Sequence, residues 1–264
     1  MPPTTFQVHL DNLIAVWMKN RSSLTALLPK GASLSIDYLP EPYYGDMDNS
    51  SIVIINMNPG VGLCCQCWHR QNDSGTEVNE AKVKKYSGYA KPFHYLDRAY
   101  TFEGTYAAAW WKPRNAWMNR ILSNLHIQTD ARPFAIELSP FHSPRFGIKD
   151  LAGHVIDLKR HGIDIVSCIE HAVLHSRAKL GLAVGKKIYD ALTDKRIGYT
   201  PISHWPPFVG SPGSLPQRKY ALIEKNGVKI LCTWAPGSNN APSSTFSGEE
   251  AAILSSIMNS KVTP

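Results

Sequence analysis

The chain of 264 residues lacks any apolar run long enough to span a membrane, and its opening, MPPTTFQVHLDNL, lacks the charged-then-apolar pattern of a signal peptide. It also lacks internal repeats and low-complexity blocks. We therefore expect a cytoplasmic protein with no membrane partner. With 43% hydrophobic residues and no convincing internal boundary, residues 1–264 are expected to form a single domain around a proper core.

Several common catalytic motifs are missing as well. GLAVGKK (181–187) is one residue too short between its glycines for a nucleotide-phosphate loop and lacks the Ser or Thr that holds magnesium. His142 and Ser143 are adjacent, but no G-x-S-x-G elbow is present to expose a nucleophile. His171 and His175 have the spacing of helical metal ligands without the glutamate of HExxH, which favours a solvated helix face.

Cysteine is scarce and unevenly placed, with five residues in the chain. Three of them crowd into the segment LCCQCWH: Cys64, Cys65 and Cys67. Cys64 and Cys67 have the spacing of a metal knuckle, with His69 nearby, whereas Cys168 and Cys232 are isolated. Because no fourth ligand is evident, reduced structural thiols are favoured over a metal site, and we expect no cofactor.

Positive charge is in excess, with a net charge of +7. The cations between positions 82 and 120 include Lys84, Lys85, Lys91, Arg98, Lys112 and Arg114, and the aromatic residues among them include Tyr86, Tyr89, Trp110 and Trp111. Cations mixed with aromatic rings suit a polyanion with stackable bases, so nucleic acid is one interpretation. An ordinary solvated surface is the other, and charge alone favours it.

Four nearly continuous apolar segments predict strands: Ile52–Ile55, Phe134–Leu138, Leu180–Val184 and Ile230–Thr233. Such segments are typical of parallel strands that are covered on both faces. Helical patterns lie between them: one opened by Pro113, one through Ile165, Ile169 and Val173, and one after Gly185. This alternation predicts an α/β fold, namely a three-layer α/β/α sandwich with a central, mostly parallel four-stranded sheet.

Two segments differ from this alternation. ALIEKNGVKIL predicts two short strands joined at Asn226–Gly227, which is a two-residue hairpin signal. SHWPPFVGSPGSLPQ (203–217) is too rich in Pro and Gly for a helix or a strand, so we expect a loop there.

Three of the four predicted strands end in polar segments, which we call the first, second and third corners. They are NMNPG (56–60), ELSPFHSP (137–144) and WAPGSNNAPSS (234–244). Pro and Gly fix tight turns, while Asn and Ser supply neutral hydrogen-bonding groups. Because ligands bind beyond the carboxyl ends of strands in open parallel sheets, the corners predict one shared site at that edge.

The three corners resemble the motifs of the uracil-DNA glycosylase superfamily. NMNPG is close to the GMNPG and GINPG forms of its single-strand-selective and mismatch-specific branches. ELSPF resembles the second strand-end segment of the family, and APGSNNAPS falls where the family has its late His-Pro-Ser-Pro loop. The resemblance implies a uracil-DNA-glycosylase-like fold. It also implies hydrolysis of the bond between a base and deoxyribose, with the nucleotide flipped out of the duplex.

The resemblance also assigns roles to residues of the first corner. It places Asn58 where the family holds the attacking water beneath the anomeric carbon, with Met57, Pro59 and Gly60 lining the pocket. Trp68 lies near the position of the family's stacking Phe, and core packing is the alternative for it. For Asn58, the alternative is that it only turns or caps the strand end.

In the other corners, Glu137 and Ser139 are expected to contact the base. The residues expected to contact DNA are Ser143, Gly237, Ser238, Asn239 and Asn240. The short polar groups of the third corner can hydrogen-bond phosphates or partly fill the vacated base stack. The large apolar wedge of the family is missing from this corner.

Glu137 stands where the family reads uracil with an Asn. A carboxylate only accepts hydrogen bonds, so it is mismatched to a uracil carbonyl but suits the exocyclic amine of cytosine. If Glu137 is buried, its pKa should rise, and the protonated acid could donate to cytosine N3 and help the base to leave. This predicts a cytosine-like base. An ion pair of Glu137 with Arg145 or another surface cation is the alternative.

Ala235 stands where many relatives have a catalytic His, so uracil-type activity should be poor. Together with Gly237 it leaves room for a bulky 5-substituent, as in hydroxymethylcytosine or its glucosylated form. Similarity to relatives that act on such bases implies a role in defence against phages. No Lys lies in these motifs to form a Schiff base, so we expect hydrolysis without strand cleavage.

The sequence thus predicts a monofunctional DNA glycosylase that removes a flipped, modified cytosine-type base and leaves an abasic site. The expected partner is DNA, and we expect a monomer without an obligate protein partner. Three alternatives stay open: a uracil or mismatch glycosylase in base-excision repair, a catalytically silent reader of modified bases, and a hydrolase of free nucleosides. The missing His favours the silent reader.

Overall fold

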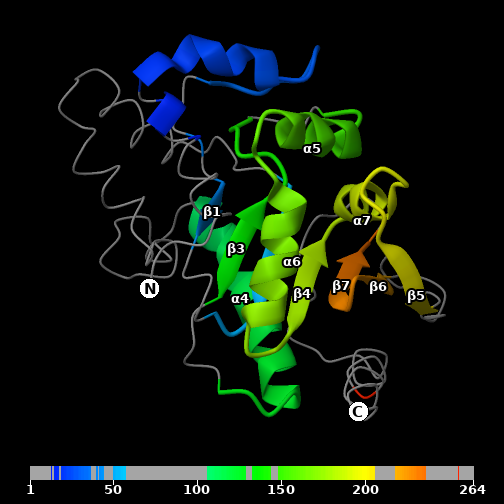
Figure 1. Ribbon diagram of the computed structural model, residues 1–264. Coiled ribbons are helices and arrows are strands. Elements are labelled where there is room, and N and C mark those ends of the chain that lie inside the picture. Colours follow the sequence, from blue (N-terminus) through cyan, green and yellow to red (C-terminus); the bar gives the residue numbers. More distant parts are fainter. Residues whose placement is uncertain are drawn as a thin grey trace, which may run out of the picture.

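The computed structural model describes residues 13, 15–17, 19–36, 40, 42–44, 50–57, 106–128, 133–143, 148–205, 218–235 and 255. In chain order the elements are η1 (Arg21–Leu27), β1 (Tyr43–Tyr44), β2 (Val53–Asn56), α4 (Tyr106–Asn124), β3 (Phe134–Glu137), α5 (Leu151–Arg160), α6 (Ile165–His175), β4 (Leu180–Val184), α7 (Lys186–Thr193), β5 (Thr200–Trp205), β6 (Lys219–Lys225) and β7 (Val228–Trp234). Strands and helices alternate over much of this range, which makes the protein an α/β protein (Figure 1).

A mixed sheet forms the centre, and within the described residues it has seven strands in the order β1-β3-β2-β4-β7-β6-β5. The four strands expected from the sequence are the central ones, β3, β2, β4 and β7, and they run parallel. The prediction that the sheet has four strands is wrong. β1 extends the sheet on one side and β6 and β5 extend it on the other, and all three pair antiparallel. β1 has two residues and β5 contains Pro201, so neither has the long apolar run of a buried strand.

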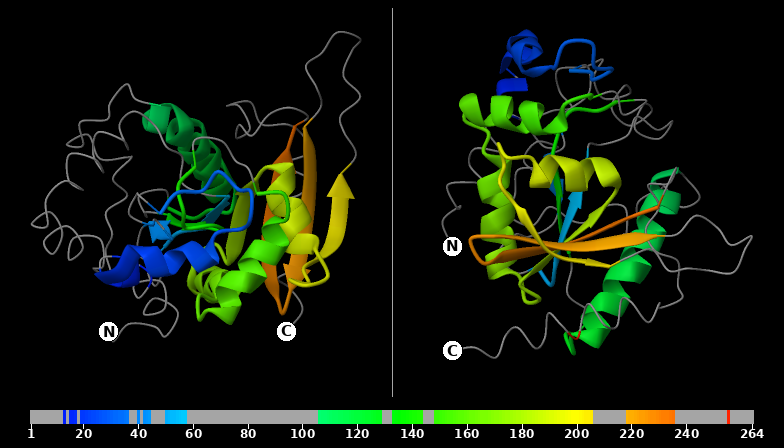
Figure 2. Two further views of the ribbon diagram at one scale, coloured as in Figure 1. Left: turned by 90° about the horizontal axis from the view of Figure 1, so that it is seen from above. Right: turned by 90° about the vertical axis from the view of Figure 1, so that its right-hand side faces the viewer.

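The central strands contribute to two hydrophobic cores, one on each face of the sheet. Val53 and Ile55 of β2 lie in a core with residues of α5, α6 and α7. Ile52 and Ile54 lie in a second core, with Trp117 and other residues of α4. Figure 2 shows the same arrangement, with α4 on the opposite face from α5 and α7. Alternation along the pleated strands therefore decides which helix each side chain meets.

Two of the expected helices are confirmed, and the third begins earlier than expected. α6 buries Ile165, Ile169 and Val173, as its spacing predicted, and α7 follows Gly185 directly. α4 begins at Tyr106 and contains Pro113, so the prediction that this proline opens the helix is wrong. Proline costs a helix one hydrogen bond, and an exposed position permits the local distortion. Among the described residues, no helix combines the length and apolarity needed to cross a bilayer.

The hairpin expected at Asn226–Gly227 is confirmed. These residues join β6 to β7 and have φ angles of 54° and 78°, and two successive positive φ angles are typical of a type I′ turn. The loop expected over 203–217 is wrong at its start, because Ser203–Trp205 pairs with β6 as the end of β5. An edge strand needs hydrogen bonds along one side only, which allows polar residues and proline. Residues 206–217 lie outside the described residues.

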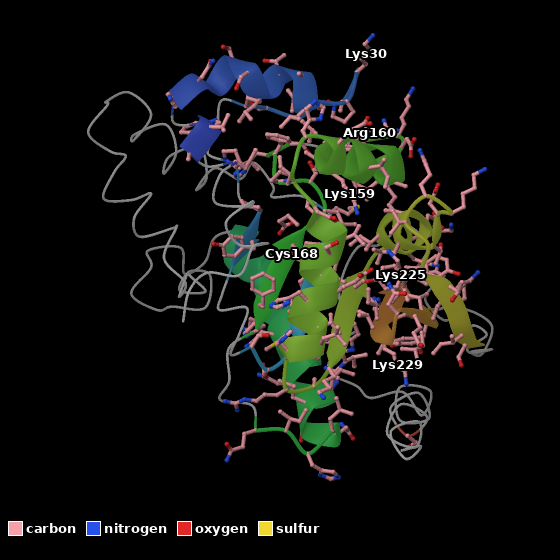
Figure 3. All side chains as sticks on the ribbon, in the orientation of Figure 1. Lys30, Lys159, Arg160, Cys168, Lys225 and Lys229 are labelled. Carbon is pink, nitrogen blue, oxygen red and sulfur yellow. The ribbon has the colours of Figure 1, made fainter. Side chains whose placement is uncertain are left out.

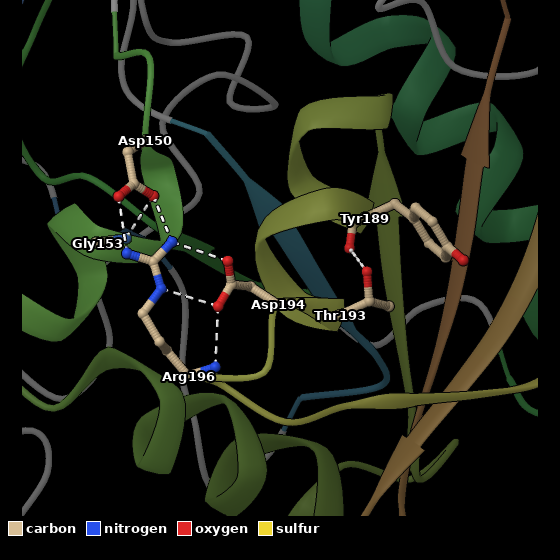
Figure 4. A network of polar contacts seen from close by, with 6 residues as sticks. All are labelled: Asp150, Gly153, Tyr189, Thr193, Asp194 and Arg196. Carbon is tan, nitrogen blue, oxygen red and sulfur yellow. Dashed lines mark hydrogen bonds and ion pairs between the residues drawn. The ribbon is translucent and has the colours of Figure 1, made fainter.

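A charged cluster links the start of α5 to the segment that follows α7 (Figure 4). Arg196 binds Asp150 at 2.7 Å and Asp194 at 2.8 Å, and the Asp150 carboxylate caps α5 by accepting from the Gly153 amide at 2.9 Å. Hydrogen bonds from Arg196 lower the pKa of both carboxyl groups. Exposed ion pairs of this kind add little stability. The cluster matters because α5 carries a residue that contacts the second corner.

Asp164 is expected to stabilise α6 as its N-cap. Its carboxylate accepts from the amide of Ser167 at 3.1 Å and pairs with Lys159 at 2.8 Å. Burial raises the pKa of this carboxyl group, but the hydrogen bonds from Lys159 and Ser167 outweigh that effect and lower it. Asp164→Ala should lower the free energy of unfolding by about 1 kcal/mol in urea titrations. Asp164→Asn should lose less because an amide oxygen still caps, and an unchanged midpoint for Asp164→Ala would contradict the assignment.

Candidate active site

β2 and β3 end side by side in a buried polar pair. Their register places Asn56 opposite Glu137, and Asn56 Nδ2 donates a hydrogen bond to Glu137 Oε1 at 3.0 Å. The two residues are 4% and 3% exposed. The first and second corners therefore start from neighbouring strands, with an amide and a carboxyl group in contact at the carboxyl edge of the sheet.

The pair lies on the face of the sheet that α4 covers. Asn56 is two residues after Ile54 and Glu137 two after Ala135, and both of these apolar residues belong to the α4 core. Because side chains two apart along a strand share a face, the polar pair continues that layer. Arg114 lies one helical turn before Met118 on the buried stripe of α4 and is 2% exposed. The layer therefore holds a guanidinium as well, and a solvated surface is the wrong interpretation for Arg114.

Backbone hydrogen bonds continue the β2–β3 pairing into the corners. The Leu138 amide donates to the Asn56 carbonyl at 3.0 Å, and the Ser139 amide donates to the Met57 carbonyl at 2.8 Å. Met57 is partly buried and packs against the core on the α5–α7 face. Two residues expected to contact the base, Met57 and Ser139, are thus adjacent.

The side chain of Ser139 contacts a histidine on α5. Its Oγ lies 3.0 Å from His154 Nε2, and both side chains are buried. Burial lowers the pKa of His154 to about 4, so the imidazole is neutral at neutral pH. The Phe141 ring packs beside it, with ring centroids 6.4 Å apart. The Ser139 hydroxyl thus anchors the second corner to α5, and a base contact by Ser139 stays a prediction.

The rest of the second corner is also buried. His142 is fully buried, its carbonyl accepts from the Ser35 amide at 2.9 Å, and Ser143 is 4% exposed. The predicted DNA contact of Ser143 stays a prediction. The predicted site residues outside the described residues are Asn58, Pro59, Gly60, Trp68, Gly237, Ser238, Asn239 and Asn240.

The third corner follows β7 and begins at the same edge of the sheet as the first two corners. β7 is parallel to β4, which is parallel to β2, so the three strands end at one edge (Figure 1). Trp234 at the end of β7 stacks on Tyr189 of α7, with centroids 4.6 Å apart, and Ala235 follows it half-buried. The strand topology thus starts all three corners at one edge, as the sequence predicted.

Two residues of this region, Asn56 and His154, were not identified as site residues from the sequence. One feature of the sequence points to Asn56 as a site residue: Asn56 and Glu137 are each the polar last residue of an otherwise apolar strand. His154 had no comparable signal, since its contact with Ser139 depends on how α5 packs.

No known family, curated protein or solved structure matches the chain.

Metal ligands do not cluster in the described part of the chain, where no group of three or more His, Cys, Asp or Glu side chains could hold an ion. Cys64, Cys65 and Cys67 lie outside the described residues. Cys168 and Cys232 are free and buried, and burial raises the pKa of both thiols.

Many cations on the described surface have acidic partners. The pairs include Lys159–Asp164 at 2.8 Å, Arg160–Asp157 at 2.7 Å and Lys225–Glu170 at 2.9 Å, and Figure 3 labels their three cations. Paired cations of this kind are ordinary solvated surface. Contact with DNA stays a prediction, and most of the cation-rich stretch falls in 58–105, outside the described residues.

Proposed function

We propose that the protein is a monofunctional DNA glycosylase that hydrolyses the N-glycosidic bond of a flipped, modified cytosine-type base and leaves an abasic site. The observation that carries this proposal is the buried contact between Asn56 and Glu137 at the carboxyl edge of parallel strands. Ligands of α/β sheets bind at this edge, and a buried carboxyl group there is a candidate for acid chemistry. Helices on both faces support the three-layer, uracil-DNA-glycosylase-like fold.

Glu137 is the proposed base reader and acid. The amine of a cytosine-type base donates to its carboxyl group, and in the neutral form the acid donates to N3. A buried site strengthens these hydrogen bonds, because little water competes for them. Proton donation to N3 stabilises the departing base, while the first corner supplies Asn58 to hold the attacking water.

The proposed substrate, a modified cytosine-type base, indicates the biological role. Ala235, which directly follows β7, would leave room for a hydroxymethyl or glucosyl-hydroxymethyl group, and such groups mark the DNA of some phages. We place the protein in the cytoplasm, acting as a monomer on phage DNA in antiviral defence.

A substrate panel tests the proposal. Oligonucleotides with cytosine, hydroxymethylcytosine, glucosyl-hydroxymethylcytosine or uracil, single-stranded and duplex, are incubated with the protein. Abasic sites are counted, and the released base is identified by mass spectrometry. We expect release of a modified cytosine without strand cleavage, and a fall of about 10²-fold or more for Asn58→Ala.

Each alternative function predicts a different result of the panel. Robust uracil release without action on modified cytosine would reject the proposal in favour of a repair glycosylase. Tight binding of DNA without release of a base, unchanged by Asn58→Ala, would identify a silent reader. The presence of Ala235 in place of a His favours this alternative. Cleavage of free nucleosides that DNA does not inhibit would identify a nucleoside hydrolase.

A further inference from the structure

We propose that His154 of α5 is a positioning residue that holds the second corner, and through it Glu137, in the geometry that base release requires. This inference rests on the proposed function, in which Glu137 reads the base and acts as the acid. The role of His154 is indirect, because its contacts are with the second corner.

The imidazole of His154 contacts the second corner at two places. Its Nε2 lies 3.0 Å from Ser139 Oγ, and its ring packs beside that of Phe141, with centroids 6.4 Å apart. Ser139 and Phe141 are fully buried and His154 is 3% exposed, so little water competes for the hydrogen bond. The hydrogen bond fixes the direction of the Ser139 side chain, and the ring contact limits how far the segment can shift.

Ser139 is close enough to Glu137 for this contact to affect the proposed acid. Glu137 is the last residue of β3, and the chain bends over the next two residues, Leu138 and Ser139. At the bend, the Ser139 amide donates to the Met57 carbonyl at 2.8 Å and the Ser139 hydroxyl group is bonded to His154. A shift of Ser139 would therefore displace the backbone that follows Glu137, together with the start of the first corner.

The helix that carries His154 is itself held in place. Asp150 caps α5 by accepting from the Gly153 amide at 2.9 Å, and it pairs with Arg196 at 2.7 Å. One turn later, the amide of His154 donates to the Asp150 carbonyl at 3.1 Å. α5 lies near the carboxyl ends of the central strands (Figures 1 and 2). Because a misplacement of about 1 Å can cost an enzyme roughly 10²-fold in rate, such a support bears on catalysis.

Two variants that differ by one methylene group test the role of His154. The amide of His154→Gln reaches the position of Nε2 and can donate or accept, so it should bind the Ser139 hydroxyl group and keep kcat within roughly 3-fold. The amide of His154→Asn ends short of Ser139, so kcat on a modified cytosine should fall roughly 10- to 100-fold with a small change in KM. Loss of the ring contact alone would lower kcat in both variants, because both lack the imidazole.

A double-mutant cycle measures whether His154 acts through Ser139. Ser139→Ala should also lower kcat, and its combination with His154→Asn should be no slower than the slower of the two single variants. Effects that multiply would show that the residues act independently and would overturn the inference. An unchanged kcat in Ser139→Ala, which removes one oxygen atom, would overturn it even if His154→Asn did not fold.

Two controls separate positioning from stability. His161→Asn changes an exposed histidine just after α5, whose Nδ1 is bonded to the Asp157 carbonyl at 2.8 Å, and kcat should not change. Leu158→Ala removes core packing from α5 and should lower the urea midpoint of unfolding while leaving kcat of the folded protein unchanged. If His154→Asn behaves like Leu158→Ala, His154 is only structural and the inference is overturned while the proposed function stands. If the unaltered protein releases no base, the proposed function is overturned and the inference with it.

Discussion

Glu137→Gln should lower kcat on a modified cytosine by about 10²- to 10⁴-fold, the usual contribution of a general acid. Glutamine has the shape of the neutral acid, and its carbonyl oxygen can still accept from Asn56 Nδ2, which lies 3.0 Å from Oε1 in the unaltered pair. Its amide can still donate to cytosine N3 but cannot transfer a proton. The expected result is therefore a large loss in kcat with a small change in KM, measured by base release under single-turnover and steady-state conditions.

Two further variants complete this experiment. Glu224→Gln makes the same change on β6, away from the carboxyl edge of the central strands, and should leave the kinetics unchanged. Glu137→Asn shortens the side chain and should lose activity on cytosine-type bases. If Glu137→Asn acts on the original substrate as well as before, Glu137 does not read the base.

Acid should destabilise the protein between about pH 6.5 and pH 4 through His154, whose pKa burial lowers from 6.5 to about 4. In this window the unfolded chain binds a proton on the imidazole and the folded protein does not. The free energy of unfolding therefore falls as the pH falls. The full loss amounts to about 3 kcal/mol. Above the window the imidazole is neutral in both states and this contribution to stability is complete.

Urea titrations across the window measure this effect. His154→Gln removes the titration and keeps an amide that can bind the Ser139 hydroxyl, so the stability of this variant should depend less on pH. His161→Gln changes an exposed histidine just after α5 and should keep the slope of the unaltered protein. Equal slopes for His154→Gln and the unaltered protein would contradict the assignment.

The predictable parts of the fold are those whose physical cause is local. The central strands are buried on both faces, so continuous apolar runs such as Val53–Asn56 and Leu180–Val184 identify them. The Asn226–Gly227 turn is equally local, because few residue pairs accept two positive φ angles. The proline signal predicts a start of α4 at Pro113, whereas the helix begins at Tyr106 and includes the three alanines at 107–109, which are strong helix formers.

Features that depend on distant segments could not be predicted in this way. β1 and β5 are strands only because β3 and β6 offer them an edge. α5 buries a stripe that includes Ala152 and His154, which weakens its apolar pattern. At the site, the sequence indicated Glu137 from its place in the second corner. The partnership with Asn56 required the register of β2 against β3, and the anchoring of Ser139 required the packing of α5.

The connectivity of the sheet has a consequence for the order of folding. The hairpin of β6 and β7 closes through a two-residue turn and can form early, whereas Asn56 and Glu137 are 81 positions apart in the chain. Bringing such distant segments together has a large entropic cost, which is recovered only when the central strands dock. A nascent or partly folded chain therefore contains both side chains without their contact. The chemistry proposed for Glu137 depends on this contact, so it would be absent from a chain whose central strands have not yet docked.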